Sequence, residues 1–156
     1  MDTNNKNIVS GHVAEIVLSY RPGSKVSEKP QIASSLTAIR ILRANWDESK
    51  IEFIEECKVI LLNRANRVLG IFNASSGGTA GTVVDLKVIF GAAMKASASA
   101  MILAHNHPSG SLKPSEQDKR LTERLVKAGN ILELPLIDHL IITAEGYYSF
   151  ADDGGL

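Results

Sequence analysis

The chain has 156 residues, of which 44% are hydrophobic and 22% charged, values typical of a single folded domain with a buried core. Its 17 basic residues balance 17 acidic residues, so no overall positive field favours binding to nucleic acid or to anionic lipid. The single cysteine, Cys57, excludes an intrachain disulfide and every zinc site built from paired cysteines.

The N-terminal twenty residues are too polar for a secretory signal, so we expect a cytoplasmic protein. Residues 88–104 form the longest weakly polar stretch, but Lys95, Ser97 and Ser99 interrupt it. We interpret this stretch as a buried helix followed by a buried strand, and not as a membrane span. We expect residues 1–7 to be a loose tail and residues 8–156 to be one domain.

Hydrophobic periodicity predicts an alternation of strands and helices. The expected strands span residues 14–20, 52–62, 67–73, 100–104, 136–143 and 147–150. The expected helices carry apolar faces over residues 36–46, 86–94 and 121–128. Ser34 or Ser35 is available to cap the first helix, Gly129-Asn130 is expected to end the last one, and residues 63–66 are expected to close a hairpin. Such interleaving favours an α/β sandwich around a mixed sheet.

Two histidines stand where a buried strand gives way to a Pro/Gly turn. Alternate residues of a strand point to the same side, so the imidazoles of His105 and His107 can converge on one point. Asp118 lies in the first turn of the helix that follows, from which its carboxylate can return over the end of the strand. Two histidines and one carboxylate make three protein ligands and leave a fourth position for water, as in catalytic zinc sites.

Each half of this pattern also has a purely structural interpretation. A His-x-His pair at a strand end is by itself a weak signal for metal binding. Ser115 and Asp118 have the spacing of a helix N-cap followed by an acidic residue, which stabilises many helices. The two interpretations are compatible, because a capped helix start is a rigid place from which to present Asp118.

The complete spacing is more specific. His-x-His, seven residues and then Ser-x-x-Asp matches the JAMM signature of the JAB/MPN metallopeptidases. The string His105-Asn106-His107-Pro108-Ser109-Gly110, with Pro114-Ser115 and Asp118, resembles the RadC branch of that superfamily. The resemblance extends from about residue 52 to the C-terminus and includes residues 136–142. It implies a single-domain, cytidine-deaminase-like α-β-α fold around a mixed sheet.

The resemblance also implies roles for the site residues. It makes His105, His107 and Asp118 the ligands of a Zn²⁺ ion, and it makes Ser115 the residue whose hydroxyl steadies the oxyanion. A glutamate before an apolar strand activates the water, and the family pattern places it at Glu55. Strand alternation alone leaves Glu56 as a rival, because it puts the two glutamates on opposite faces without saying which face meets the metal. The implied activity is hydrolysis of an amide, peptide or isopeptide bond.

The chain departs from longer RadC proteins in two respects. Those proteins carry a helix-hairpin-helix module upstream, whereas we expect at most one strand and one helix before residue 52. Residues 85–88 read Asp-Leu-Lys-Val where relatives often show His-Pro-Arg-Glu. Both departures concern substrates and partners, which the sequence does not identify, and neither touches the metal ligands. Oligomeric state is equally unspecified.

Other polar features have two interpretations each. Residues 75–82 resemble a phosphate-binding loop only superficially, since they lack Gly-Lys-Ser/Thr, and a substrate-side loop is the better interpretation. Asp138-His139 is either a pair that orients a metal ligand or an ordinary buried polar pair. Nothing near Cys57 in sequence indicates an activated nucleophile.

Two other functions compete with a metallopeptidase. A nucleic-acid deaminase is excluded, because it needs His-x-Glu and Pro-Cys-x-x-Cys motifs that the chain lacks. The stronger alternative is a RadC-type binding module that contacts DNA or protein partners in genome maintenance without catalysis. The complete ligand set favours hydrolysis, because a scaffold gains nothing from an open coordination position.

Charge balance generates a prediction about DNA. We expect weak binding to duplex DNA with a shallow dependence on salt, because 17 basic and 17 acidic residues leave no net field. A fluorescence anisotropy titration at several salt concentrations measures this. Submicromolar affinity with a steep salt slope would favour the binding module instead.

Overall fold

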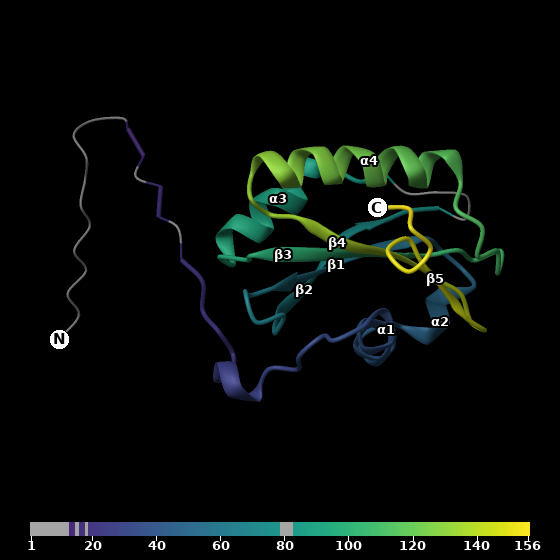
Figure 1. Cartoon of the computed structure of the whole chain (residues 1–156), viewed down its shortest axis with the longest axis horizontal. Coiled ribbons are helices and arrows are strands. Elements are labelled where there is room, and N and C mark those ends of the chain that lie inside the picture. The colour runs from purple at the N-terminus through teal and green to yellow at the C-terminus, as the bar shows by residue number, and fades with distance from the viewer. Residues whose placement is uncertain (1–12, 15, 18, 79–82) are drawn as a thin grey trace.

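The computed structural model describes residues 13–14, 16–17, 19–78 and 83–156; the expected tail, residues 1–7, lies outside this part. The described chain folds as one mixed sheet with helices against it (Figure 1). The strands are β1 (Glu56–Leu62), β2 (Val68–Ser76), β3 (Ala100–Asn106), β4 (Leu136–Ile142) and β5 (Tyr147–Ser149). The helices are the 3-10 helix η1 (Val26–Glu28) and the α-helices α1 (Ser35–Ala44), α2 (Glu48–Ile51), α3 (Leu86–Lys95) and α4 (Glu116–Ile131).

The five strands are arranged in the order β2-β1-β3-β4-β5. β1 pairs antiparallel with both β2 and β3, and the predicted hairpin is formed by β1 and β2. β3 and β4 are parallel, and α4 provides the connection between them. β5 returns antiparallel beside β4. The mixed α/β fold predicted from the sequence is confirmed.

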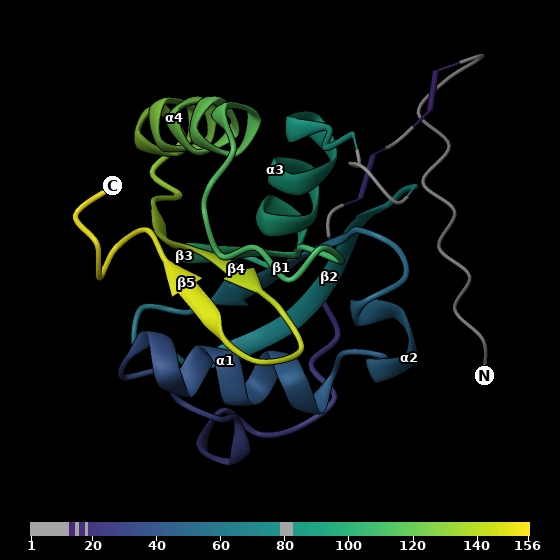
Figure 2. The same ribbon diagram turned by 90° about the vertical axis from the view of Figure 1, so that its right-hand side faces the viewer.

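The sheet is covered on both faces, as Figure 2 shows. α1 lies on one side, and its apolar residues join Ile60 and Leu62 of β1 in one hydrophobic core. α3 and α4 cover the opposite side, where the second core contains Val59 and Leu61. Every residue of β1 and β3 is buried, which explains why these strands read as continuous apolar runs in the sequence. Polar side chains on these strands are therefore held inside the fold.

Helix caps account for several boundaries. Ser34 caps α1 by accepting a hydrogen bond from the Thr37 amide at 3.3 Å, which decides between the two predicted serines. The stretch 88–104 divides into α3 and β3, as expected, and no described helix is long and apolar enough to cross a bilayer. Asp47 caps α2, so the residues before Glu56 turn instead of extending the strand, and the predicted start at residue 52 is wrong.

Two further expectations need correction. The described residues of the predicted strand 14–20 are exposed and form no strand; residues 15 and 18 lie outside the described part. The apolar and polar residues alternate in this segment, but no described strand pairs with it. Tyr20 instead donates its hydroxyl hydrogen to the Leu69 carbonyl at 2.9 Å. The last helix, α4, does not stop at Gly129-Asn130 but continues to Ile131. Glu133, between α4 and β4, has a left-handed backbone (φ 55°).

Gly129 has a packing role that generates a prediction. A Cβ atom at this position would lie 2.5 Å from the Leu134 carbonyl oxygen, so a backbone atom would have to move. We expect Gly129→Ala to lower the free energy of unfolding by about 1–2 kcal/mol, because overpacking outweighs the gain in helix propensity. Gly91, which has open space around it in α3, is the matched control. Gly91→Ala is expected to raise stability by about 0.5–1 kcal/mol in urea denaturation; equal effects at both positions would contradict the packing role.

Candidate metal centre

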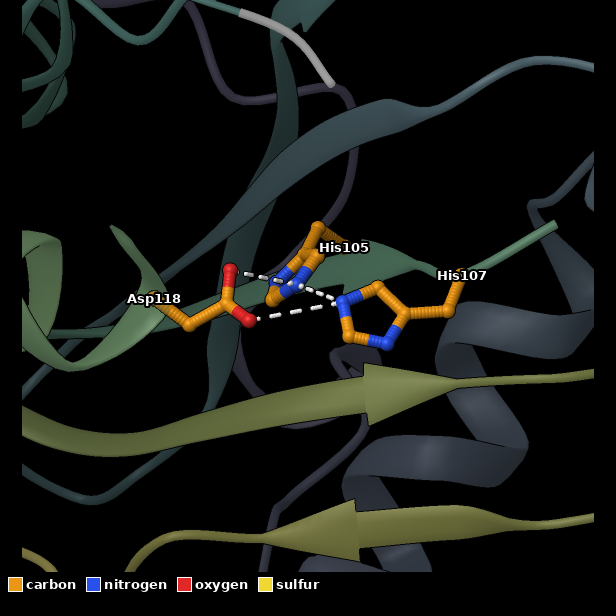
Figure 3. Close-up of side chains that lie close together, drawn as sticks. All are labelled: His105, His107 and Asp118. Carbon is orange, nitrogen blue, oxygen red and sulfur yellow. Dashed lines mark hydrogen bonds and ion pairs between the residues drawn. The ribbon is translucent and has the colours of Figure 1, made fainter. Parts of the chain in front are cut away.

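The two histidines lie at the carboxyl end of β3. His105 is next to last in the strand, is 3% exposed, and pairs with Cys57 of β1 and Ile141 of β4. His107 follows the strand end and projects to the same side, as the spacing predicts. Their Nε2 atoms face each other at 2.9 Å. Both rings therefore direct a nitrogen atom to one point, as Figure 3 shows.

Asp118 reaches this point from the first turn of α4. Ser115 is the N-cap of the helix, and its hydroxyl accepts a hydrogen bond from the Asp118 amide at 3.1 Å. In return, Oδ2 of Asp118 accepts hydrogen bonds from the Ser115 amide and hydroxyl, each at 2.7 Å. Oδ1 of Asp118 lies 3.1 Å from Nε2 of His105. The capping box and the presentation of a ligand are thus one arrangement, and both interpretations of Ser-x-x-Asp hold.

The turn after β3 fixes the orientation of His107. Gly110 adopts a left-handed backbone (φ 79°), and its amide donates to the His107 carbonyl at 3.0 Å. This turn brings the Ser111 carbonyl oxygen to 2.7 Å from Nδ1 of His107. A carbonyl only accepts, so Nδ1 carries the hydrogen, and in the neutral ring Nε2 has a free lone pair.

The three donor atoms fit a metal ion. The ligand atoms of His105, His107 and Asp118 all lie within 4.8 Å of one another. Ligands at zinc-like bond lengths in a tetrahedron are separated by roughly 3.3–3.6 Å. The observed separations are 2.9 Å between the two Nε2 atoms, 3.1 Å from His105 to Oδ1 and 3.4 Å from His107 to Oδ2 of Asp118. The cluster therefore can hold a metal with little rearrangement.

The charges of the cluster are adjusted to each other. Burial acts to raise the pKa of Asp118, but hydrogen bonds with His105, His107 and Ser115 outweigh it, so the pKa lies far below its usual value. The hydrogen bond with Asp118 raises the pKa of His107, against the opposing effect of burial. A carboxylate that stays ionised and an imidazole that attracts a proton make a strongly cation-attracting centre. A metal would take the place of that proton.

A cavity of about 680 Å³ lies beside the three donors. Its lining includes the five predicted site residues, Glu55, His105, His107, Ser115 and Asp118. Cys57 also lines it, but burial raises the pKa of the Cys57 thiol to about 12, consistent with the expectation that it is not a nucleophile. The lining also includes Glu116, so the cavity borders the start of α4.

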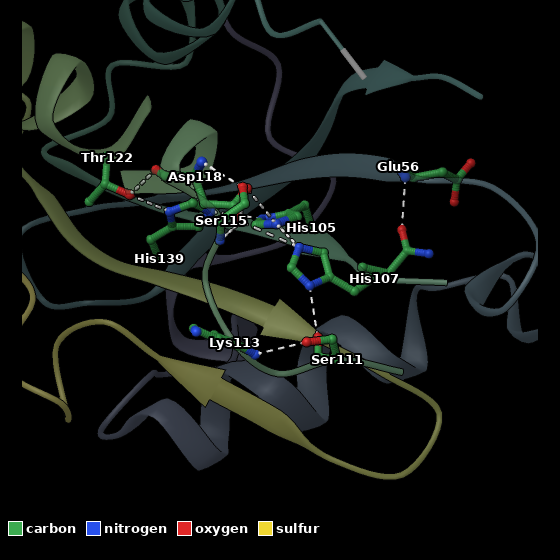
Figure 4. A network of polar contacts seen from close by, with 10 residues as sticks. Glu56, His105, His107, Ser111, Lys113, Ser115, Asp118, Thr122 and His139 are labelled. Atoms are coloured by element: carbon green, nitrogen blue, oxygen red, sulfur yellow. Dashed lines mark hydrogen bonds and ion pairs between the residues drawn. The ribbon is translucent and has the colours of Figure 1, made fainter. Parts of the chain in front are cut away.

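Glu55, which directly precedes β1, and Glu56, the first residue of the strand, have different surroundings. Glu55 lines the cavity, and its backbone pairs with Gly77 and Gly78 beyond β2. Glu56 is directed away from the histidines in Figure 4, and its Oε1 lies 3.6 Å from Nζ of Lys50. Of these two glutamates, Glu55 lines the cavity and Glu56 does not. Of the glycine-containing segment 75–82, Ser75 and Ser76 belong to β2, and residues 79–82 lie outside the described part.

Asp138 and His139 have different surroundings. Asp138 accepts hydrogen bonds from the Ser149 hydroxyl and the Ala151 amide, so it stabilises the turn after β5. His139 is fully buried, and burial lowers its pKa well below the ordinary value. Its Nε2 lies 2.9 Å from Nδ1 of His105. His139 therefore contacts a predicted ligand, and Asp138 does not.

Sequence analysis missed Thr122, which also belongs to this group. Its hydroxyl lies 2.6 Å from Nδ1 of His139 and 2.7 Å from the Asp118 carbonyl oxygen, as Figure 4 shows. Thr122 follows Asp118 by one helical turn and precedes the buried Leu125 by less than one. A polar residue in the apolar stripe of a helix was the available signal.

Comparison with known proteins agrees with this geometry. Residues 32–156 match the family described as RadC-like JAB domain. A UPF0758 protein of Porphyromonas gingivalis is 50% identical over 144 residues, covering 91% of this chain and 62% of that protein. A UPF0758 protein of Flavobacterium johnsoniae is 47% identical over 100 residues, covering 64% of this chain and 44% of that protein. The UPF0758 protein CD630_11440 of Clostridioides difficile is 36% identical over 140 residues, covering 89% of this chain and 60% of that protein.

The chain thus spans roughly half to three fifths of the length of these relatives, from 44% to 62%. The matched residues contain the whole sheet, the helices against it and all three donors of the metal centre. The chain belongs to the RadC-like JAB domain family.

Proposed function

We propose that the protein is a zinc-dependent hydrolase that cleaves an amide bond, in a peptide or as an isopeptide link between proteins. The observation that carries this proposal is the convergence of two imidazole nitrogens and a carboxylate oxygen beside a cavity that Glu55 also lines. Neither a purely structural metal site nor an ordinary helix cap needs such a cavity. A glutamate next to open donors is an arrangement suited to hydrolysis.

The donor set favours zinc among the common metals. Two imidazoles and one carboxylate suit zinc, whereas calcium and magnesium prefer oxygen ligands throughout. Among the described residues three side chains contribute, which is the number found in catalytic zinc sites, where structural sites have four. His105 and Asp118 are buried and held by hydrogen bonds, so these residues are preorganised for binding.

The chain's own residues supply the rest of the chemistry. A zinc ion held by His105, His107 and Asp118 would supply Lewis acidity, which polarises a scissile carbonyl and favours a water nucleophile near neutral pH. Glu55, on the cavity wall, takes the proton from the attacking water and delivers it to the leaving amine. The Ser115 hydroxyl lines the same cavity and donates its one hydrogen to Oδ2 of Asp118 here; in the proposed reaction it turns that hydrogen to the developing oxyanion.

Metal content gives the first test. The protein purified without chelators is expected to contain about one equivalent of zinc by inductively coupled plasma mass spectrometry, and His107→Ala to lose it, because two remaining donors bind far more weakly. Glu55→Gln is the matched control, since it changes the cavity wall without removing a donor, and it should keep the metal. Retention of stoichiometric zinc by His107→Ala would exclude the proposed ligand set.

Proteolysis gives the second test. Zinc-loaded protein is incubated with the proteome of its own host, and new N-termini are mapped by mass spectrometry. We expect Glu55→Gln to lower the yield of new termini by about 100-fold or more, because the general base is lost. Glu56→Gln is the matched control on the other face of β1 and should retain activity. Identical termini from the wild type and Glu55→Gln would refute peptidase activity.

A further inference from the structure

A polar chain inside the fold joins two of the three metal donors. Thr122 of α4 and His139 of β4 lie between His105 and the backbone of Asp118, as Figure 4 shows. Thr122 is 2% exposed and His139 is 0% exposed, so solvent does not compete for their hydrogen bonds. The β4 residue is placed there by the parallel pairing of β3 and β4, in which Leu103 lies opposite His139.

The hydroxyl of Thr122 determines which atom donates in each hydrogen bond of this chain. Its hydroxyl has a single hydrogen and lies 2.7 Å from the Asp118 carbonyl oxygen, which only accepts. The hydroxyl therefore donates to Asp118. Its oxygen is then the acceptor in the 2.6 Å contact with Nδ1 of His139, so Nδ1 of His139 carries the hydrogen.

His139 in turn determines which nitrogen of His105 carries the hydrogen. A fully buried imidazole with no carboxylate against it is neutral, so Nε2 of His139 has a free lone pair. That atom accepts the hydrogen bond from Nδ1 of His105 at 2.9 Å. With Nδ1 as the donor, His105 needs no second hydrogen on Nε2, the atom that faces His107 and Asp118, and a hydrogen shared there with Asp118 is the one that a metal ion replaces. The opposite direction would put a hydrogen on Nε2 and block it as a ligand.

Packing against Phe150 holds the His139 ring in place. The His139 ring stacks on the Phe150 ring with centroids 4.7 Å apart and planes 4° apart. The Phe150 amide also donates to the His139 carbonyl at 3.0 Å. A 180° flip of the His139 ring would keep this stack but lose both side-chain contacts. The stack therefore fixes the plane of the ring, and the two contacts select the orientation in which Nδ1 faces Thr122.

We propose that Thr122 and His139 are positioning residues that hold a hydrogen on Nδ1 of His105, so that Nε2 is the nitrogen available to the metal. The inference rests on the proposed function only in taking His105 as a ligand, and it concerns the tautomer of the metal-free protein. Removing the Thr122 hydroxyl leaves Nδ1–H of His139 without an acceptor. His139 then shifts its hydrogen to Nε2, and His105 must place its own hydrogen on the ligating nitrogen.

The test compares Thr122→Val, which keeps the size of the side chain, with Thr122→Ser, which keeps the hydroxyl. Two-bond ¹H–¹⁵N spectra of the metal-free, ¹⁵N-histidine-labelled protein report the tautomer of each ring. Competition of Zn²⁺ with a chromophoric chelator reports affinity. We expect Thr122→Val to show His105 without hydrogen on Nδ1, unlike the wild type, and to bind Zn²⁺ about 10–100-fold more weakly. Thr122→Ser should match the wild type in both measurements.

The outcomes separate this inference from the proposed function. Unchanged tautomers in Thr122→Val would overturn it, even if affinity fell, because the loss would then come from packing alone. Equal losses in the valine and serine variants would overturn it as well. Absence of hydrolysis by the wild type would refute the proposed function but leave the tautomer result standing, since that measurement needs neither metal nor substrate. Circular dichroism confirms that both variants fold.

Discussion

The main physical constraint on this structure is that it holds three electron-rich atoms close together in the protein interior. Nε2 of His105, Nε2 of His107 and a carboxylate oxygen of Asp118 lie within 4.8 Å of one another, where lone pairs repel unless a cation lies between them. Burial strengthens that repulsion, because His105 is 3% and Asp118 is 8% exposed. A fold that tolerates this arrangement must hold each donor from behind and must offer the centre a proton or a metal ion.

The architecture provides that support from separate elements. β3 presents the histidines and is itself held between β1 and β4, so His105 has little freedom to move. The start of α4 presents Asp118 through a capping box that would stabilise the helix in any case. Behind these donors, Thr122 and His139 tie the helix to the next strand. Glu55, which directly precedes β1, lines the same cavity, so the candidate catalytic groups come from three separate parts of the chain.

The local sequence pattern was sufficient to predict those parts of the site whose residues lie close together in sequence. Alternation along a strand predicted that His105 and His107 converge, and the cap spacing predicted how Asp118 is presented. The resemblance to RadC proteins joined these two pieces and selected Glu55. The contact of His139 with His105 depends on the register of two parallel strands separated by a helix, which local pattern does not contain. For the same reason, alternation put Glu55 and Glu56 on opposite faces but did not say which face meets the metal. At residues 14–20 alternation predicted a strand, which has no pairing partner among the described residues.

X-ray absorption spectroscopy at the zinc K-edge, made on the zinc-loaded protein, tests the central claim most directly. We predict a four-coordinate site with two imidazole nitrogens and light oxygen ligands at about 2.0–2.2 Å, and the loss of this zinc signal in His105→Ala. A zinc site without two imidazoles, or one whose spectrum is unchanged in His105→Ala, would show that the three donors do not share a metal ion. The hydrolytic function would then lose its physical basis.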